Sequence, residues 1–338
     1  MPLPFLFIGA AAATGLAGVG KTIKAGMDNS EAKSINEAAN NRIEKAGKQL
    51  DQSRKDCGTS LEVLGKEKLA VLNGSIKDFI NEFEKIKNIE FSNSVGLDEL
   101  HKIQFDKKSF EELKKLNGFA SSFIGGAVSG VAGGAFTAFG AYSAATTFAT
   151  ASTGTAIASL SGAAASNATL AFFGGGSLAA GGLGIAGGTA VLGGLVAGPA
   201  LLVTGMITGA KAEKNLEEAR TNSAKADEIC EELKTAMNQC RAIRRRTYMF
   251  YNLLVRADAY FTFLIYLMRQ TIRNEGEDYA LYSMEGKKII AMTSSMAGTI
   301  KAIMDTAILT EEGNLTNSSE VIAENLLEEI EERDKNFK

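Results

Sequence analysis

The most regular feature of the chain is a hydrophobic repeat in two long, charged stretches, residues 29–115 and 211–273. Apolar side chains recur there at steps of three and four, which places them on one face of an α-helix. Members of the first row are Ile35, Ala39, Ile43, Ala46, Leu50, Leu61 and Leu64, and members of the second are Leu216, Ala219, Ala226, Ile229, Leu233, Met237, Cys240 and Ile243. With only 3 prolines in 338 residues, we predict long helices that pair as an antiparallel bundle or coiled coil.

The end of the chain continues the helical pattern. A further helix is predicted over residues 287–307, followed by a turn with Gly313 at its tip and an acidic helix. No alternation of strand and helix patterns occurs anywhere. The predicted fold is therefore all-α, an elongated antiparallel bundle with coiled-coil arms.

Between the two arms lies a block of different composition. Residues 116–210 contain no Asp, Glu, Lys or Arg, although 22% of the chain is charged, and they hold 22 of its 36 glycines. The chain therefore divides into an apolar N-terminal segment (1–28), a charged helical arm (29–115), the glycine-rich block (116–210) and a second arm with an acidic tail (211–338).

Within the block, many glycines stand four residues apart. Small residues at that spacing let two helices approach closely inside lipid, whereas each glycine costs a helix in water about 1 kcal/mol relative to alanine. The candidate helix-packing glycines are Gly126, Gly130, Gly134, Gly184, Gly188, Gly194, Gly198, Gly205 and Gly209. We expect the block to form a helical hairpin, or two, that inserts into or oligomerises in a bilayer.

The number of membrane crossings follows from length and flanking charge. A span needs about 20 residues, so the block has room for two to four. Because both of its ends are lysine-rich, the positive-inside rule puts both arms on the cytoplasmic side and makes the number of crossings even. Two other states are open: a protein that is soluble in the cytoplasm before insertion, and a soluble glycine-rich core shielded by the arms.

The N-terminal segment contains the pattern of a phosphate-binding loop, "GLAGVGKT". Its candidate nucleotide-binding residues are Gly15, Gly20, Lys21 and Thr22. A working phosphate loop also needs a preceding strand and a later apolar strand ending in Asp, and neither pattern is found. The segment is dense in small residues, which favours a membrane-seeking terminus, and its lysines follow the apolar run, unlike those of a cleavable signal peptide.

Composition limits the chemistry further. A net charge of −3 gives no general attraction to nucleic acid, and three cysteines with the single His101 offer no zinc spacing. No nucleophile with its base, paired-carboxylate site or metal cluster is visible, so we expect no enzyme, cofactor, metal or small-molecule substrate. Four arginines before an aromatic stretch are candidates for binding anionic lipid head groups: Arg241, Arg244, Arg245 and Arg246.

Several stretches carry a resemblance to a known group of proteins. These are "MPLPF", "EAKSINEAA", the run from "ATASTGTAIASLSGAAASNATLAFFGGGSLAAGGLGIAGGT" to "LLVTG", and "KAEKNLEEA". Together they resemble a family of uncharacterised bacterial proteins with a glycine-zipper-like block between coiled-coil arms. The resemblance implies an architecture and a bacterial host but no activity. A likeness of plan alone connects the chain to α-helical pore-forming proteins.

Three functions compete at this stage. The leading expectation is a membrane-associated homo-oligomer whose block inserts into a bilayer, with pore formation as one outcome. The second is a coiled-coil scaffold at the membrane surface without pore activity. The third is a nucleotide-dependent membrane remodeller that uses residues 15–22.

Overall fold

The structure is a computed structural model, and it describes residues 30–89, 106–125, 139–141, 216–310 and 314–336. In these ranges the chain is helical and contains no strand, which confirms the all-α prediction. The main helices are α1 (Ser30–Val71), α2 (Lys77–Phe83), α3 (Lys107–Gly125), α8 (Leu216–Glu275), α9 (Met284–Asp305) and α10 (Asn317–Asn336).

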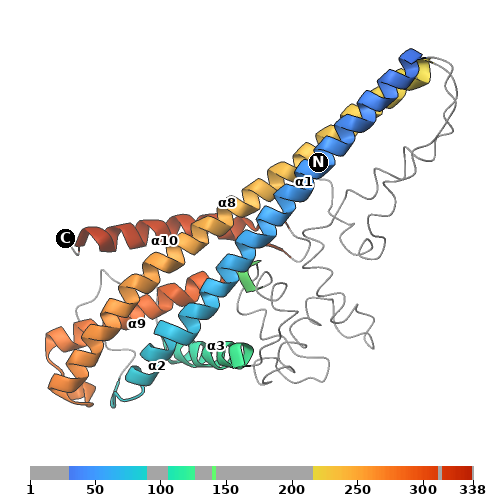
Figure 1. Ribbon diagram of the computed structural model, residues 1–338. Coiled ribbons are helices and arrows are strands. Elements are labelled where there is room, and N and C mark those ends of the chain that lie inside the picture. Colours follow the sequence, from blue (N-terminus) through green and yellow to red (C-terminus); the bar gives the residue numbers. More distant parts are fainter. Residues whose placement is uncertain (1–29, 90–105, 126–138, 142–215, 311–313, 337–338) are drawn as a thin grey trace.

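The two longest helices, α1 and α8, pair along their length and form an extended stalk (Figure 1). They run parallel, not antiparallel as we predicted. Arg42 of α1 meets Asp227, Asp56 meets Arg244, and a parallel bridge joins Lys87 to Asp278. Partner numbers therefore rise together, with a separation that stays between 181 and 188 in the hydrogen bonds between these helices.

The physical reason for the difference is that a hydrophobic repeat fixes which face of a helix is buried but not its direction. Direction depends on the connection. Both helices begin at the end of the stalk that lies away from α3 and α9, which we call the distal end; the opposite end is the base (Figure 1). The chain therefore returns to the distal end before α8 begins. The 74 residues from 142 to 215 are ample for that path, because 42 helical residues span only about 63 Å.

The buried seam of the stalk changes character along its length. At the distal end it consists of alanines spaced by seven, Ala32, Ala39 and Ala46 on α1 and Ala219 and Ala226 on α8. Toward the base the buried seam carries leucine and phenylalanine, such as Leu64 and Phe250. Larger side chains bury more apolar area, so the base is the more stable end.

A π-helical turn, η1 (Leu72–Ile76), separates α1 from α2. A π-turn inserts one residue into a helix and disturbs its hydrogen-bond ladder. Here the Leu72 carbonyl accepts a hydrogen bond of 2.6 Å from the Asn117 amide of α3, and Ser121 donates to the Asn73 side chain. The turn is therefore the place where α3 joins the stalk.

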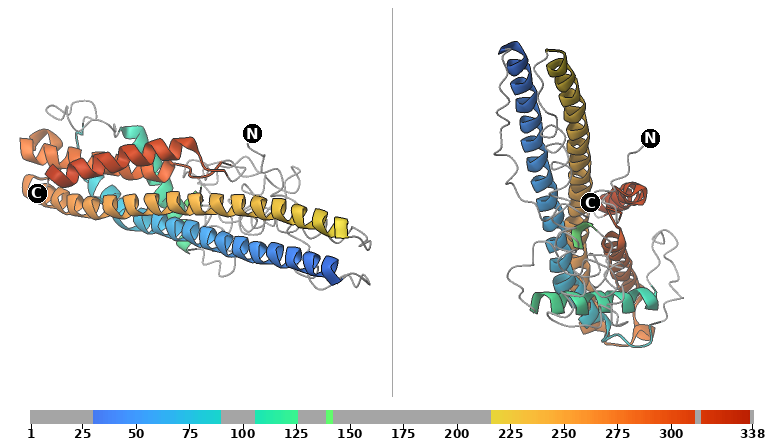
Figure 2. Two further views of the ribbon diagram at one scale, coloured as in Figure 1. Left: turned by 90° about the horizontal axis from the view of Figure 1, so that it is seen from above. Right: turned by 90° about the vertical axis from the view of Figure 1, so that its right-hand side faces the viewer.

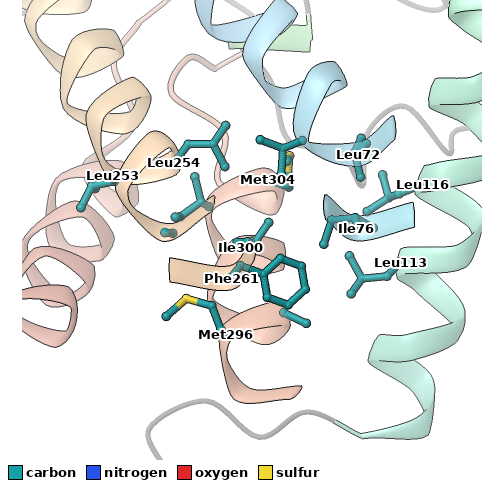
Figure 3. Packing of buried hydrophobic residues seen from close by; sticks show 14 of the residues in the cluster. Leu72, Ile76, Leu113, Leu116, Leu253, Leu254, Phe261, Met296, Ile300 and Met304 are labelled. Carbon is teal, nitrogen blue, oxygen red and sulfur yellow. The ribbon is translucent and has the colours of Figure 1, made fainter. Parts of the chain in front are cut away.

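The main core lies at the base, where α3 packs across η1 and α2 and where α9 doubles back along α8 (Figure 2). Leucine, isoleucine, methionine and phenylalanine side chains from four helices meet there (Figure 3). Phe79 is central, with ring centroids of Phe83, Phe110 and Phe261 at 5.1, 6.2 and 5.4 Å.

The C-terminal elements agree with the sequence pattern. Helix α9 covers most of the predicted 287–307 stretch, and α10 is the acidic closing helix. Between them the chain reverses, since Leu309 bridges to Leu315 in antiparallel fashion and Thr310 donates to the Asn314 carbonyl. The first charged stretch departs from one continuous helix, because α2 ends at Phe83 and α3 begins at Lys107.

Candidate functional site: the seat of the glycine-rich block

One short piece of the charge-free block, the helical turn 139–141, is packed beside the middle of α1 (Figure 1). Gly140 makes the closest contact. A β-carbon added to it would lie 2.0 Å from the Leu61 carbonyl oxygen and 3.1 Å from the Gly65 amide nitrogen. No other residue type fits at this approach, so the glycine brings two backbones into direct contact.

The main chain of the same turn is captured by the segment that follows α9. The Ala141 carbonyl accepts hydrogen bonds from the amides of Ile308, at 2.8 Å, and Leu309, at 3.0 Å. Ala141, Ile308 and Leu309 are all buried. Each such bond contributes about 1 kcal/mol net, and leaving a buried partner without one costs more.

A buried lysine completes this arrangement. Lys68 of α1 is fully buried, with its Nζ 5.8 Å from the centre of the Phe139 ring and 3.5 Å from the Met304 carbonyl oxygen. A cation over an aromatic face is attracted by the ring's quadrupole. Burial lowers the pKa of Lys68 to about 8, although nearby Asp305 opposes the shift.

We call this region the seat of the block. It comprises Leu61, Gly65, Lys68, Phe139, Gly140, Ala141, Met304, Ile308 and Leu309.

Beside the seat, Lys301 connects α9 to α3. Its Nζ lies 2.8 Å from a Glu112 carboxylate oxygen and also pairs with Asp305. Burial alone would lower the pKa of Lys301, but the hydrogen bonds with Asp305 and Glu112 raise it overall. Lys301 is therefore the ion-pair partner of Asp305, and Lys68 is not its main partner.

A second polar cluster lies on the stalk next to the π-turn. The Ser75 hydroxyl donates a hydrogen bond to the Asp258 carboxylate of α8, and Glu67 is nearby. Burial raises the pKa of Asp258, while the bond from Ser75 lowers it in part. Burial and the charge of Asp258 raise the pKa of Glu67. Ser75 is therefore the hydrogen-bond partner of Asp258 in the stalk.

A third cluster sits higher in the stalk around Arg54. Its side chain is buried, and its Nη1 has no hydrogen-bond partner and lies 3.8 Å from the Asp51 carboxylate. Burial lowers the pKa of Arg54 and raises the pKa of the Cys57 thiol to about 12. A thiol so hard to ionise is a poor nucleophile, so Cys57 is a packing residue.

The predicted arginine cluster divides between two roles. Arg244 pairs with Asp56 of α1 at 3.2 Å, and Arg246 pairs with Glu320 of α10 and donates to Ser319. Arg241 and Arg245 are exposed and form no ion pair within the described part of the chain. The structure thus separates two bundle-forming arginines from two that face solvent.

The other predicted site residues lie outside the described residues. They are the zipper glycines Gly126 to Gly209 and the nucleotide-binding candidates Gly15, Gly20, Lys21 and Thr22. Among the described helices, none combines the length and apolar character needed to cross a membrane. In the same ranges, no group of three His, Cys, Asp or Glu side chains is placed to hold a metal ion.

The seat itself was not predicted from the sequence, although one signal was present. Arg54 and Lys68 stand seven residues before and after Leu61, and all three are buried. Two cations on the same helical face as a predicted core leucine indicate buried polar sites. The contact of Gly140 with Leu61 carries no comparable signal, because it joins segments 79 residues apart.

Comparisons with known protein families, with curated proteins and with solved structures gave no match. The resemblance to a bacterial family therefore stays a prediction.

Proposed function

We propose that this protein is a non-enzymatic, membrane-associated helical protein that carries its glycine-rich block on a helical scaffold and delivers it to a bilayer. The observation that carries the proposal is the seat, in which the turn 139–141 of the block is fastened to α1 and to the segment that follows α9. The turn is held by a glycine contact, two backbone hydrogen bonds and one buried lysine, and all of these contacts are non-covalent.

The energetic argument concerns the rest of the block. A segment with 22 glycines and no charge is poorly suited to isolated helices in water, whereas close helix packing in lipid uses small residues. A scaffold that holds such a segment until it meets lipid would keep it from aggregating. Oligomerisation within the bilayer, with a pore as one form, is the state that we propose after delivery.

The test uses the full chain with liposomes. We expect the protein to float with vesicles and to release an entrapped dye. Gly130→Leu should leave flotation intact, because leucine is the more apolar residue, but should reduce detergent-resistant oligomers and dye release by holding helices apart. Gly47→Leu, at a position on α1 with open space around it, is the matched control. A chain that never floats with vesicles would overturn the proposal.

A second candidate is a coiled-coil scaffold at the membrane surface. The parallel pairing of α1 and α8 favours it, since it makes an extended stalk that is independent of the block (Figure 1). Flotation without dye release, unchanged in Gly130→Leu, would support this candidate over the first. Nucleotide binding that is lost in Lys21→Ala would instead favour the remodeller.

A further inference from the structure

The outer face of α8 is unusually rich in exposed aromatic and apolar side chains. Helix α8 is contacted by α1, α9 and α10, and one face is left without a described helix on it (Figure 2). Tyr248 and Tyr266 on that face are 46% and 54% exposed, and Met249, Val255 and Phe263 are exposed as well. Single exposed apolar residues are ordinary, but a row of four, Tyr248, Val255, Phe263 and Tyr266, with Met249 beside it, marks an interaction surface.

The spacing shows that these residues share one face with the unpaired arginines. Arg241, Arg245, Tyr248, Val255 and Tyr266 all fall within about 80° of arc at 100° per residue. The row is about 37 Å long, from a basic end to an aromatic end. We call it the outer face of α8.

Charge determines which occupant fits. From residue 241 to 273 there are seven arginines and one acidic residue, Asp258, although the whole chain is net negative. Asp258 accepts a hydrogen bond from Ser75 of η1, and Arg269 pairs with Asp78 and Glu82 of α2. The outer face therefore carries positive charge without a carboxylate on it.

A second copy of the chain is a poor occupant of this face. Parallel pairing of two outer faces would set Arg241 against Arg241, and antiparallel pairing would bring it near Arg269 or Arg273 of the other copy. Like charges in register are destabilising. An anionic partner therefore fits the outer face of α8 better than a second copy of the chain.

We propose that the outer face of α8 binds the surface of a bilayer that contains anionic phospholipid. Arginines bind the phosphate groups, and tyrosines take the interfacial level that aromatic rings prefer in membranes. A single row of side chains along one face of a helix matches a flat surface. This inference rests on the proposed function in one respect, that the same bilayer receives the block. It adds that the scaffold lies on that bilayer with the outer face of α8 toward the lipid.

The experiment measures binding of the full-length chain to vesicles of phosphatidylcholine alone and of phosphatidylcholine mixed with phosphatidylglycerol, at low and high salt. Arg241→Glu/Arg245→Glu should weaken binding to the anionic vesicles by roughly 30-fold or more, since each basic residue contributes about fivefold, and should flatten the salt dependence. Tyr248→Ser/Tyr266→Ser should weaken binding while the salt dependence stays.

The matched control is Arg220→Glu/Lys225→Glu, the same charge change at exposed positions in the distal half of α8. It should bind anionic vesicles almost as the parent chain does. All three variants change exposed side chains, and circular dichroism checks that they remain helical.

The outcomes separate the inference from the proposed function. Binding to neutral vesicles and dye release that persist in the arginine variant would support delivery of the block, while an unchanged affinity for anionic vesicles in that variant overturns the role of the outer face. Loss of a self-associated species in the arginine variant, without a change in vesicle binding, would identify a second copy as the occupant. Preferential binding of single-stranded nucleic acid by the same two arginines would also overturn the inference.

Discussion

At the residue scale, the least expected feature is a lysine in the core. Lys68 is fully buried in mostly apolar surroundings. Its amine contacts the Met304 carbonyl oxygen and the Phe139 ring. Burial disfavours the charged form, which lowers its pKa to about 8 from an ordinary value of 10.5. Lys68 lowers the stability of the fold at neutral pH. Its presence is therefore better explained by its contact with Phe139 in the seat than by a contribution to stability.

The first prediction concerns pH. Between pH 8 and 10.5 the unfolded chain holds a proton on Lys68 that the folded chain has released, so the free energy of unfolding should rise with pH by up to about 3 kcal/mol from this group. Below pH 8 both states are protonated and the contribution is constant. Urea unfolding at several pH values, compared with Lys68→Met, measures it.

In Lys68→Met the rise should vanish, and the variant should be the more stable chain at pH 7 by about 1 to 3 kcal/mol. Lys66→Met, which removes an exposed lysine paired with Glu62, is the control and should keep the rise. A parallel pH profile for Lys68→Met and the parent chain would show that Lys68 is not the titrating group.

A second prediction at this scale concerns Gly140. Alanine there would place a methyl group 2.0 Å from the Leu61 carbonyl, so α1 and the turn 139–141 must separate. We expect a loss of about 1 to 3 kcal/mol in the free energy of unfolding. Gly47→Ala on α1, where nothing lies within 4 Å, should instead stabilise by up to about 1 kcal/mol. Thermal and urea unfolding of the two variants compares them, and equal effects would mean that the close contact is absent in solution.

At the element scale, the stalk should not be equally stable along its length. Alanines line the distal seam, whereas leucine and phenylalanine line the base. The smaller cluster around Leu50, Leu233 and Met237 lies between these regions. The distal half is also tied by exposed polar contacts such as Arg42 with Asp227, which contribute little in water.

We therefore predict a gradient of amide hydrogen exchange. Amides of residues 30–46 and 216–233 should exchange about 100-fold faster than those of 61–80 and 250–268, through local opening of the distal stalk. Exchange measured by mass spectrometry on the full chain tests this. Uniform protection along both helices would show that the stalk opens as one cooperative unit.

The same elements show what the sequence could and could not predict. Helical periodicity correctly identified α8, α9 and α10, because each buries one face against a neighbour. The π-turn was missed because Asn117, from a distant helix, supplies the hydrogen bond to Leu72. The ion pairs of Arg244 with Asp56 and of Arg246 with Glu320 could not be predicted either, because the partners are remote in sequence.

At the scale of the whole molecule, the parallel stalk sets where the block is attached. The chain reaches the base through α1, passes the seat at residues 139–141, and starts α8 at the distal end of the stalk (Figure 1). The described parts of the block, residues 116–125 of α3 and the turn 139–141, are therefore held away from the distal tip, where α8 begins. An antiparallel pair would have joined both ends of the block to the same end of the stalk.

The last prediction tests this topology. The side chains of Asn36 and Asn222 are joined by a hydrogen bond of 3.1 Å near the distal end. In a chain with its three native cysteines changed to alanine, Asn36→Cys/Asn222→Cys should therefore be joined in high yield by a short bifunctional maleimide. The pair Asn36→Cys/Asn274→Cys should not react, because residue 274 lies about 78 Å further along α8. Digestion and mass spectrometry of the linked peptides give the readout, and samples diluted until only monomers remain exclude links between copies. Linkage of Asn36 with Asn274 in such a sample would require the antiparallel arrangement, and the block would then leave and rejoin the stalk at one end.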